Sequence, residues 1–374
     1  MPRGTHGPVL PVEGRELAVV AARHAARADA DRGLPAELME SIVSAGFARH
    51  FVPSRWGGAA GSLDALVRSV AALGEGCTSA AWNASVIAAA GRMGAFLPRE
   101  GQQELWAKGA DTVVVGALMP RGRAVPVDGG WRLGGEWGYA SAVGSSDWAL
   151  VCAMVQGEER PTPWFFAVPR ADYSVADTWN STGMRATGSN TLVADGVFVP
   201  RHRGFPRQDM ITGRSVGSDA PCHTAPLRLV SGLFFGAPAL GAARAALRAY
   251  AEHTAPVPAD NPAPRLALAR ATSAVDAAEL LLLRAARVAD RTETAALAPV
   301  RNPADCAFAV ERLVDAVESL VRAAGSSALT GGGPLERVWR DVHSLASHVA
   351  LRFEPVGTPY GARLLEASGG PDAR

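Results

Sequence analysis

Hydrophobic residues recur at helical spacing through the first hundred residues of the chain. Apolar positions three and four apart run through residues 15–27, 35–46 and 63–73, and an alanine-rich stretch surrounds Trp82. Glycine and proline, which commonly begin or end helices, punctuate these stretches. The pattern predicts an N-terminal helical domain over residues 1–110.

The period changes between residues 111 and 205. Runs rich in β-branched and aromatic residues are separated there by Gly, Asp and Pro, which is typical of strands joined by turns. The expected strands are residues 112–118, 130–139, 147–155, 163–168 and 190–200. This central domain is expected to be a small antiparallel barrel or sandwich.

Helical periodicity returns at Leu227. Two long amphipathic segments follow at residues 264–287 and 303–321, and their length and apolar stripes are typical of helix bundles. The pattern predicts a C-terminal bundle domain over residues 206–374. The whole chain is therefore expected to be an α+β protein that is mostly α.

The last helix of the bundle carries two histidines. A Gly-rich turn precedes it, and on a helical wheel Asp341, Ser344 and His348 fall on one stripe, whereas His343 lies on another face. His348 thus has polar neighbours and is a candidate for chemistry. The alternative is that both histidines satisfy local partners in a packed helix. Asp341 either orients His348 or pairs with Arg337, four residues earlier.

Composition excludes several kinds of partner. The 37 basic and 36 acidic residues nearly cancel, so no long-range field favours nucleic acid or an anionic membrane. The four cysteines form no C-x-x-C pair, and we expect no metal site. Residues 1–6 lack a signal-like apolar run, and no uninterrupted apolar stretch reaches 18 residues. A cytoplasmic protein is expected.

Four local segments carry a family resemblance across nearly the whole chain. They are Val-Pro-Ser-Arg-Trp-Gly-Gly at 52–58, the Gly-, Trp- and Ser-rich segment 134–148, Asn-Ser-Thr-Gly-Met-Arg-Ala-Thr-Gly-Ser-Asn-Thr at 180–191, and Glu-Arg-Val-Trp-Arg-Asp-Val-His at 336–343. With the helix, strand, helix order, they resemble the acyl-CoA dehydrogenase superfamily. More closely, they look like the two-component flavin monooxygenases built on that fold, whose C-terminal domain is a four-helix bundle.

The resemblance implies a flavin site formed by two of these segments. It implies that residues 137–141 lie against the flavin ring, with Trp137 and Tyr139 beside it and Ser141 near N5. The second segment would border the flavin through Trp179, Thr182, Arg185, Thr187 and Ser189. The alternatives are a strand end that packs aromatic residues and a plain hairpin turn.

The same resemblance separates dehydrogenase from oxygenase chemistry. Many acyl-CoA dehydrogenases carry their catalytic glutamate just after the Arg-Asp helix, but residues 347–352 contain no acid here. The monooxygenase branch commonly has a histidine where His348 falls. His348 is therefore the candidate general base or hydrogen-bond organiser at the substrate, with His343 as a second candidate.

Two further residues are candidate substrate contacts. Several relatives carry a histidine in the helix after the Ser-x-x-Trp segment that ends at Trp82, but the corresponding residues 88–93 contain only one charged group, Arg92. Arg92 either meets an anionic group of the substrate or is an exposed arginine at a helix end.

The resulting hypothesis is an oxygenase component that takes reduced FMN or FAD from a separate NAD(P)H:flavin reductase. With O2 it would hydroxylate a small aromatic, polyketide-like or amino-sugar substrate. The alternatives are a flavin-dependent dehydrogenase or oxidase and a non-catalytic helical scaffold. The family's dimer-of-dimers assembly implies a homotetramer.

Overall fold

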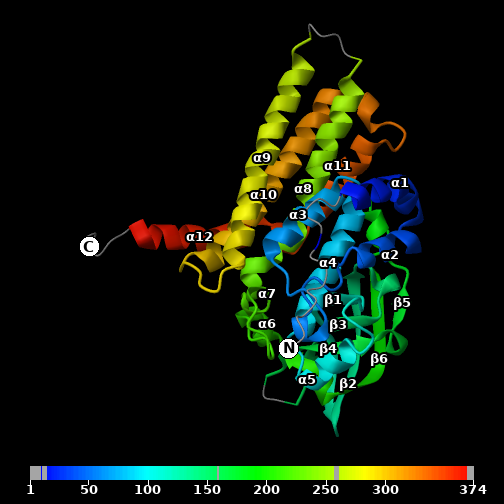
Figure 1. Cartoon of the computed structure of the whole chain (residues 1–374), viewed down its shortest axis with the longest axis vertical. Helices are drawn as coiled ribbons and strands as arrows, with labels where there is room; N and C mark the ends of the chain where they lie inside the picture. The colour runs from blue at the N-terminus through cyan, green and yellow to red at the C-terminus, as the bar shows by residue number, and fades with distance from the viewer. Residues whose placement is uncertain (1–9, 11–14, 158–159, 257–260, 369–374) are drawn as a thin grey trace, which may run out of the picture.

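A computed structural model describes residue 10 and residues 15–157, 160–256 and 261–368. Residues 1–6, which bear on the question of a signal segment, lie outside this part. Helices come first, then a sheet, then more helices (Figure 1). This is the predicted order. One apolar core runs through helices and sheet alike, so the domain boundaries after residues 110 and 205 stay our proposal.

The N-terminal helices surround one deeply buried helix, α4. They are α1 (Arg15–Asp31), α2 (Ala36–Ser44), α3 (Leu63–Gly74), α4 (Thr78–Gly94) and α5 (Arg99–Leu105). Ser62 caps α3, because its Oγ accepts a hydrogen bond from the backbone N–H of Ala65. Nearly every residue of α4 is buried, which explains why its alanine-rich sequence shows little amphipathic pattern.

The central sheet is open and mixed, so the expectation of an antiparallel barrel or sandwich was wrong. Its seven strands lie in the order β5-β6-β2-β1-β3-β4-β7, and β1 and β3 are parallel. The strands are β1 (Val114–Val127), β2 (Gly130–Ala140), β3 (Trp148–Val155), β4 (Thr162–Pro169), β5 (Ser174–Ala176), β6 (Asn190–Pro200) and β7 (Gly204–Pro206).

The mixed topology follows from the connection between β2 and β3. After β2, residues 141–147 cross to the other side of β1, and β3 therefore runs parallel to β1. The five longer strands match the predicted runs, although β1 extends further than expected. The three-residue edge strands β5 and β7 were missed, because such short runs carry no alternation.

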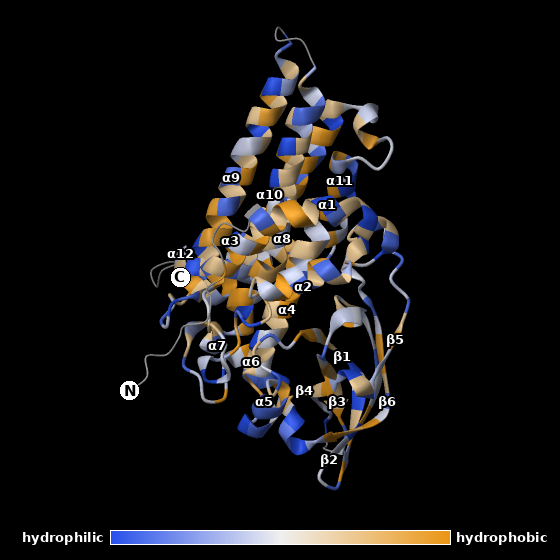
Figure 2. Cartoon of the chain, turned by 45° about the vertical axis from the view of Figure 1, so that its right-hand side comes forward, coloured by the Kyte–Doolittle hydropathy of each residue, from blue (hydrophilic) through white to orange (hydrophobic). Residues whose placement is uncertain are grey.

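The C-terminal helices form a bundle on the helical lobe. After the short helices α6 (Arg207–Thr212) and α7 (Pro221–Thr224), helix α8 (Leu227–Thr254) packs against α3, α4, α9 (Ala263–Ala289), α10 (Ala298–Ala324) and α11 (Pro334–Ala346). Apolar residues gather where α3, α4 and α8 meet (Figure 2). The last helix, α12 (Phe353–Ser368), runs away from the bundle and buries no residue.

Helix α8 is long and apolar enough to suit a membrane span by composition, the only such helix in the described ranges. However, 78% of the apolar window is buried inside the protein. Its hydrophobic residues therefore contact other helices, and α8 is a core helix.

Candidate functional site

The candidate site lies where the sheet, the helical lobe and the bundle meet. Its residues come from α4, from the end of β2, from the loop between β5 and β6, from α8, and from the segment after α11. Three non-glycine residues of the site have positive φ: Tyr139 (61°) at the end of β2, Ala142 (60°) just after β2, and Met184 (56°) in the loop between β5 and β6. Such conformations are uncommon, and they cluster at functional sites.

Three aromatic side chains from different elements contact one another at this place. The rings of Phe235 and His348 lie 3.9 Å apart between centroids, and Trp82 lies 5.0 Å from Phe235 and 5.7 Å from His348. Trp82 belongs to α4 and Phe235 to α8. Trp82, a candidate substrate contact, and His348 therefore lie together in the fold.

A chain of hydroxyl groups begins at the Trp82 indole. Its Nε1 donates to Ser141 Oγ at 2.9 Å, and Ser141 Oγ lies 2.8 Å from Ser189 Oγ. Ser189 Oγ lies 2.6 Å from Thr187 Oγ1, which donates to the carbonyl of Met184 at 2.8 Å. Ser141, Thr187 and Ser189, predicted from two distant segments, thus form one network.

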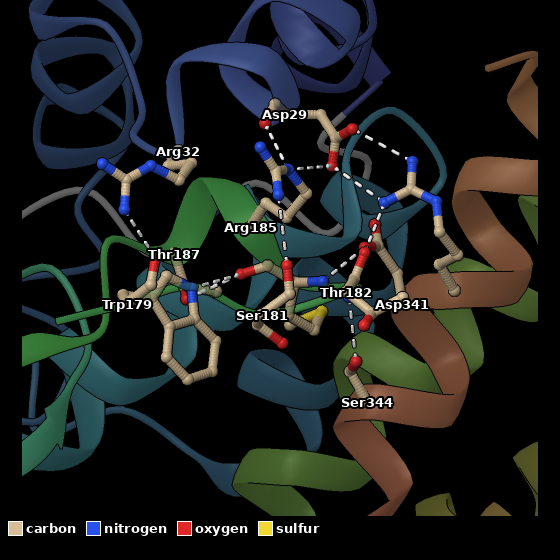
Figure 3. A network of polar contacts seen from close by, with 12 residues as sticks. Asp29, Arg32, Trp179, Ser181, Thr182, Arg185, Thr187, Asp341 and Ser344 are labelled. Carbon is tan, nitrogen blue, oxygen red and sulfur yellow. Dashed lines mark hydrogen bonds and ion pairs between the residues drawn. The ribbon is translucent and has the colours of Figure 1, made fainter.

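Helix α11 holds the 182–184 backbone by three side chains (Figure 3). The N–H of Met184 donates to Asp341 at 2.6 Å, the N–H of Gly183 donates to Ser344 Oγ at 3.1 Å, and Arg340 donates to the carbonyl of Thr182 at 2.6 Å. A Cβ on Gly183 would lie 2.1 Å from the Arg340 carbonyl oxygen. Only glycine allows this close approach.

Asp341 has a different partner from either one predicted. Its carboxylate binds the Met184 N–H and neither orients His348 nor forms an ion pair with Arg337. Burial raises the pKa of Asp341 to about 7, and the nearby carboxylate of Asp29 adds to the shift. Asp341 is therefore a buried acid that positions the loop.

The arginine of the same loop is already engaged. Arg185 donates to the carbonyls of Asp29 and Ser181, and its Nε lies 3.9 Å from the Asp29 carboxylate. The structure gives no support to the expectation that Arg185 would border the flavin, because its Nε and Nη1 are bound by Asp29 on α1 and by Ser181 in its own loop. Figure 3 shows Arg185 directed toward Asp29.

Two aromatic residues leave ring surface open beside this loop. Tyr139 is 72% exposed, and its ring meets the half-buried Trp179 edge to face at 5.9 Å. The Trp179 indole N–H donates to the Met184 carbonyl at 3.0 Å. Thr182 is exposed in the same loop. These residues suit a flat, hydrogen-bonding ligand.

Trp137 does not belong to this surface. It is 1% exposed, and its indole N–H donates to the carbonyl of Cys152 at 2.7 Å within the sheet. Gly122 leaves room for the ring, since a Cβ there would lie 2.1 Å from it. Side chains alternate between the two faces of a strand. The Trp137 ring therefore lies on the buried face of the sheet, and almost none of its surface is open to a flavin.

His348 lies beyond the helix on which it was expected. Helix α11 ends at Ala346, and His348 Nδ1 accepts a hydrogen bond from the backbone N–H of Ala350 at 3.2 Å. Burial lowers the pKa of His348 to about 4, so the ring is neutral near pH 7. A neutral ring whose Nδ1 accepts must carry its proton on Nε2. No side chain or backbone group in the described residues binds Nε2.

His343 lies outside the site. Its side chain is exposed on α11, with Nδ1 2.8 Å from the Trp339 carbonyl and Nε2 3.6 Å from Glu318. The prediction that His343 lies on another face of the helix is confirmed. The structure gives no support to a catalytic role for His343, because its contacts are with Trp339 and Glu318.

Arg92 is neither a substrate contact nor an exposed arginine. It is 1% exposed, and its guanidinium donates to the carbonyls of Cys222 and Ala225. Burial lowers its pKa to about 10, and no carboxylate of the described residues forms an ion pair with it. Arg92 therefore ties α4 to α7 and to the start of α8.

We predict that Arg92→Met lowers the free energy of unfolding by about 3 kcal/mol, because two buried carbonyls lose their donor. Urea unfolding would measure the loss. The exposed Arg99→Met at the start of α5 is the matched control and should change stability little. A rise in substrate KM without loss of stability would instead support a role for Arg92 in binding substrate.

Phe235 is the site residue that sequence analysis missed. It is one of two adjacent phenylalanines in an apolar run of α8. Phe234 is buried in the core, whereas Phe235 is half-buried beside His348. Periodicity along a helix that is apolar on most faces does not reveal which of two neighbouring aromatic residues faces a site.

The thiols and potential metal ligands contribute nothing further. Cys77, Cys152, Cys222 and Cys306 are free and buried. Within the described ranges, no three His, Cys, Asp or Glu side chains gather in a way that could hold a metal ion.

Comparison with known proteins agrees with this fold. The family described as "Acyl-CoA dehydrogenase, C-terminal domain" matches residues 233–353. The oxygenase component of an FADH2-dependent resorcinol hydroxylase from Rhizobium sp. (strain MTP-10005) is 30% identical over 361 residues, which cover 89% of this chain and 88% of that protein.

Two solved structures are similar over almost their full length. The 3-HSA hydroxylase from Rhodococcus sp. RHA1 has a TM-score of 0.91 at 27% identity, covering 97% of this chain and 98% of that one. XiaF from Streptomyces sp., in complex with FADH2 and glycerol, has a TM-score of 0.88 at 26% identity, covering 95% and 94%. The chain therefore belongs to the family of oxygenase components of two-component flavin-dependent monooxygenases, which share the acyl-CoA dehydrogenase fold.

Proposed function

We propose that this enzyme hydroxylates a small, phenol-like aromatic substrate, using reduced flavin and O2. The observation that carries the proposal is the contact of Trp82, Phe235 and His348 beside Ser141. Aromatic rings favour flat ring substrates through stacked and edge contacts. Relatives named for their action on resorcinol and p-hydroxyphenylacetate support this substrate class.

The flavin ring would lie against Tyr139 and Ser141, with Trp179 and Thr182 at its border. When bound in its reduced form, the flavin would supply the electrons that activate O2, and O2 would supply the oxygen atom. The protein residues orient the ring and keep water away. Thr187 and Ser189 act behind Ser141, since both are buried within the loop.

His348 would act as a hydrogen-bond donor to the substrate. Its lowered pKa and the Ala350 contact leave an Nε2–H group and no free basic nitrogen. Such a donor can hold the oxygen of a phenol or phenolate and thereby orient the ring carbon to be oxidised. Of the two predicted roles, the structure favours organiser over general base.

The name "oxygenase component" in relatives implies a second protein that reduces the flavin. We propose that a separate NAD(P)H:flavin reductase supplies this chain with FMNH2 or FADH2, and that both work in the cytoplasm, where the four free thiols stay reduced.

We further propose a homotetramer. Large apolar side chains are exposed on the bundle helices α9 and α10 and on α12, none of whose residues is fully buried within its own chain. The exposed residues are Leu266, Leu280, Phe308, Leu364 and Leu365. Subunit contacts would cover them. Sedimentation equilibrium should give four times the chain mass, and a monomer would contradict this assembly.

The decisive experiment measures coupling. The protein, an unrelated flavin reductase, NADH and FMN or FAD are mixed in air with resorcinol or p-hydroxyphenylacetate. We expect a product that contains one atom from 18O2, with little product when the protein is omitted. Bleaching of oxidised flavin by substrate under anaerobic conditions would instead identify a dehydrogenase. Failure to bind reduced flavin would identify a scaffold.

A further inference from the structure

The hydroxyl chain that starts at Trp82 has a definite direction. An indole N–H is only a donor, and a backbone carbonyl is only an acceptor. The chain begins at the first kind of group, on Trp82, and ends at the second, on Met184. The three hydroxyls between them contribute one hydrogen each, so the hydrogens can be assigned by counting.

The assignment proceeds from the carbonyl end. Thr187 uses its only hydroxyl hydrogen on the Met184 carbonyl, at 2.8 Å. The 2.6 Å contact between Thr187 and Ser189 therefore needs the hydrogen of Ser189. The 2.8 Å contact between Ser189 and Ser141 then needs the hydrogen of Ser141. Ser141 also accepts from Trp82, and one lone pair of its oxygen remains free.

Both ends of the chain are held in place. The Met184 carbonyl also accepts from the Trp179 indole and from the Thr187 backbone N–H, at 3.0 and 3.2 Å, and the Met184 N–H is bound by Asp341. At the other end, Trp82 packs against Phe235 and His348. Thr187 and Ser189 are at most 4% exposed, so water has little access to the two inner hydroxyls.

We propose that this directed chain makes Ser141 a hydrogen-bond acceptor only, and that the enzyme thereby discriminates in favour of reduced over oxidised flavin. The inference rests on the proposed placement of the flavin ring with N5 at Ser141. Reduced flavin carries a hydrogen on N5 and can donate to the free lone pair. Oxidised flavin has a lone pair on N5, which would face the lone pair of Ser141.

Thr187 and Ser189 are positioning residues in this scheme, since they set the direction of the Ser141 hydrogen without touching N5. In Thr187→Val, Ser189 loses its acceptor and can turn its hydrogen toward Ser141. The Ser141 hydrogen is then free to point at N5. In Ser189→Ala, the acceptor of Ser141 is removed directly. Both variants should gain affinity for oxidised flavin and keep their affinity for reduced flavin.

The test is the ratio of dissociation constants for oxidised and dithionite-reduced FMN and FAD, titrated anaerobically without substrate. We expect a ratio of at least about 10 for the natural protein and a ratio near 1 for Thr187→Val and Ser189→Ala. The midpoint potential of bound flavin should shift by about 30 mV toward the free value for each tenfold loss. Thr272→Val, which removes a hydroxyl that donates to the Leu268 carbonyl in α9, is the matched control and should leave the ratio unchanged.

Two results would overturn the inference. One is an unchanged ratio in both variants, and the other is an equal loss of affinity for both flavin forms, which would indicate a purely structural role. Failure of the natural protein to bind any flavin would reject the proposed function itself. The two failures are therefore distinguishable.

Discussion

His348→Ala is expected to lower the rate of substrate hydroxylation about 100-fold while reduced flavin still binds. His348 contacts Trp82 and Phe235, whereas the flavin-facing hydroxyls belong to other elements. The variant should continue to consume O2 and release hydrogen peroxide in place of product. Product formed per O2 consumed is the measurement.

Two variants serve as comparisons. His343→Ala removes the exposed histidine of α11 and should retain natural coupling. His348→Gln keeps an N–H donor and should recover part of the activity that alanine loses. The donor role would be rejected if His348→Gln were no more active than His348→Ala and if coupling required an unprotonated base at this position.

The pH profile gives an independent check on His348. Its pKa is lowered to about 4 by burial, so the ring stays neutral from pH 5 upward and loses this state only as pH falls through 4. The ratio of product to O2 consumed should therefore show no transition near pH 6.5. A transition there that disappeared in His348→Gln would contradict the assignment.

The second large effect is expected at Asp341, in the pH dependence of stability. Burial raises its pKa from 3.8 to about 7, so the folded protein prefers the protonated acid. The stabilisation from this preference is complete below about pH 4 and is lost as pH rises through 7. Between pH 5 and pH 8 the loss amounts to about 2 to 3 kcal/mol.

Asp341→Asn should remove this pH dependence, because an amide accepts from the Met184 N–H but does not ionise. Urea unfolding at pH 5, 6, 7 and 8 would compare the two proteins. The free energy of unfolding of the natural protein should fall steadily, relative to that of Asp341→Asn, as pH rises. The charged groups around Asp341 are the same in both: Arg337 and Arg340 on α11 and Asp29 on α1.

The exposed Asp195→Asn is the matched control and should follow the natural protein at every pH. A constant difference in stability between the natural protein and Asp341→Asn across the range would show that Asp341 is ionised throughout. The arginines would then outweigh the effect of burial.

The hydrogen bonds that hold residues 182–184 against α11 predict a third effect, on flavin affinity. Gly183→Ala would place a methyl group 2.1 Å from the Arg340 carbonyl oxygen and should push the loop away from α11. Reduced-flavin affinity should fall at least about tenfold, because Trp179 and Thr182, which would border the flavin, lie on this loop. Gly361→Ala, in α12 where an added Cβ would meet nothing within 4 Å, tests whether glycine loss alone matters.

The local sequence pattern determined the order and type of the main helices and strands of this protein. Helical and strand periods located most of the main elements within a few residues, although β1 continues beyond its predicted run, since burial on one face imposes a repeat that the sequence must carry. The segments at the end of β2 and before β6 were a candidate flavin site, because the family resemblance implies one there. Resemblance to a family identified the flavin and the oxygenase chemistry.

Only the tertiary structure decided which of these residues meet. Arg185 and Arg92 carried charges that suggested ligands, but Asp29 on α1 and the carbonyls of α7 bind them instead. Trp137 and Phe235 show the same limit, because facing depends on what packs above each element. Partners distant in sequence also bury the His348 ring and, in the proposed scheme, set the direction of the Ser141 hydrogen. Local periodicity predicts neither property, since each follows from contacts that form only when α4, α8, α11 and the sheet come together.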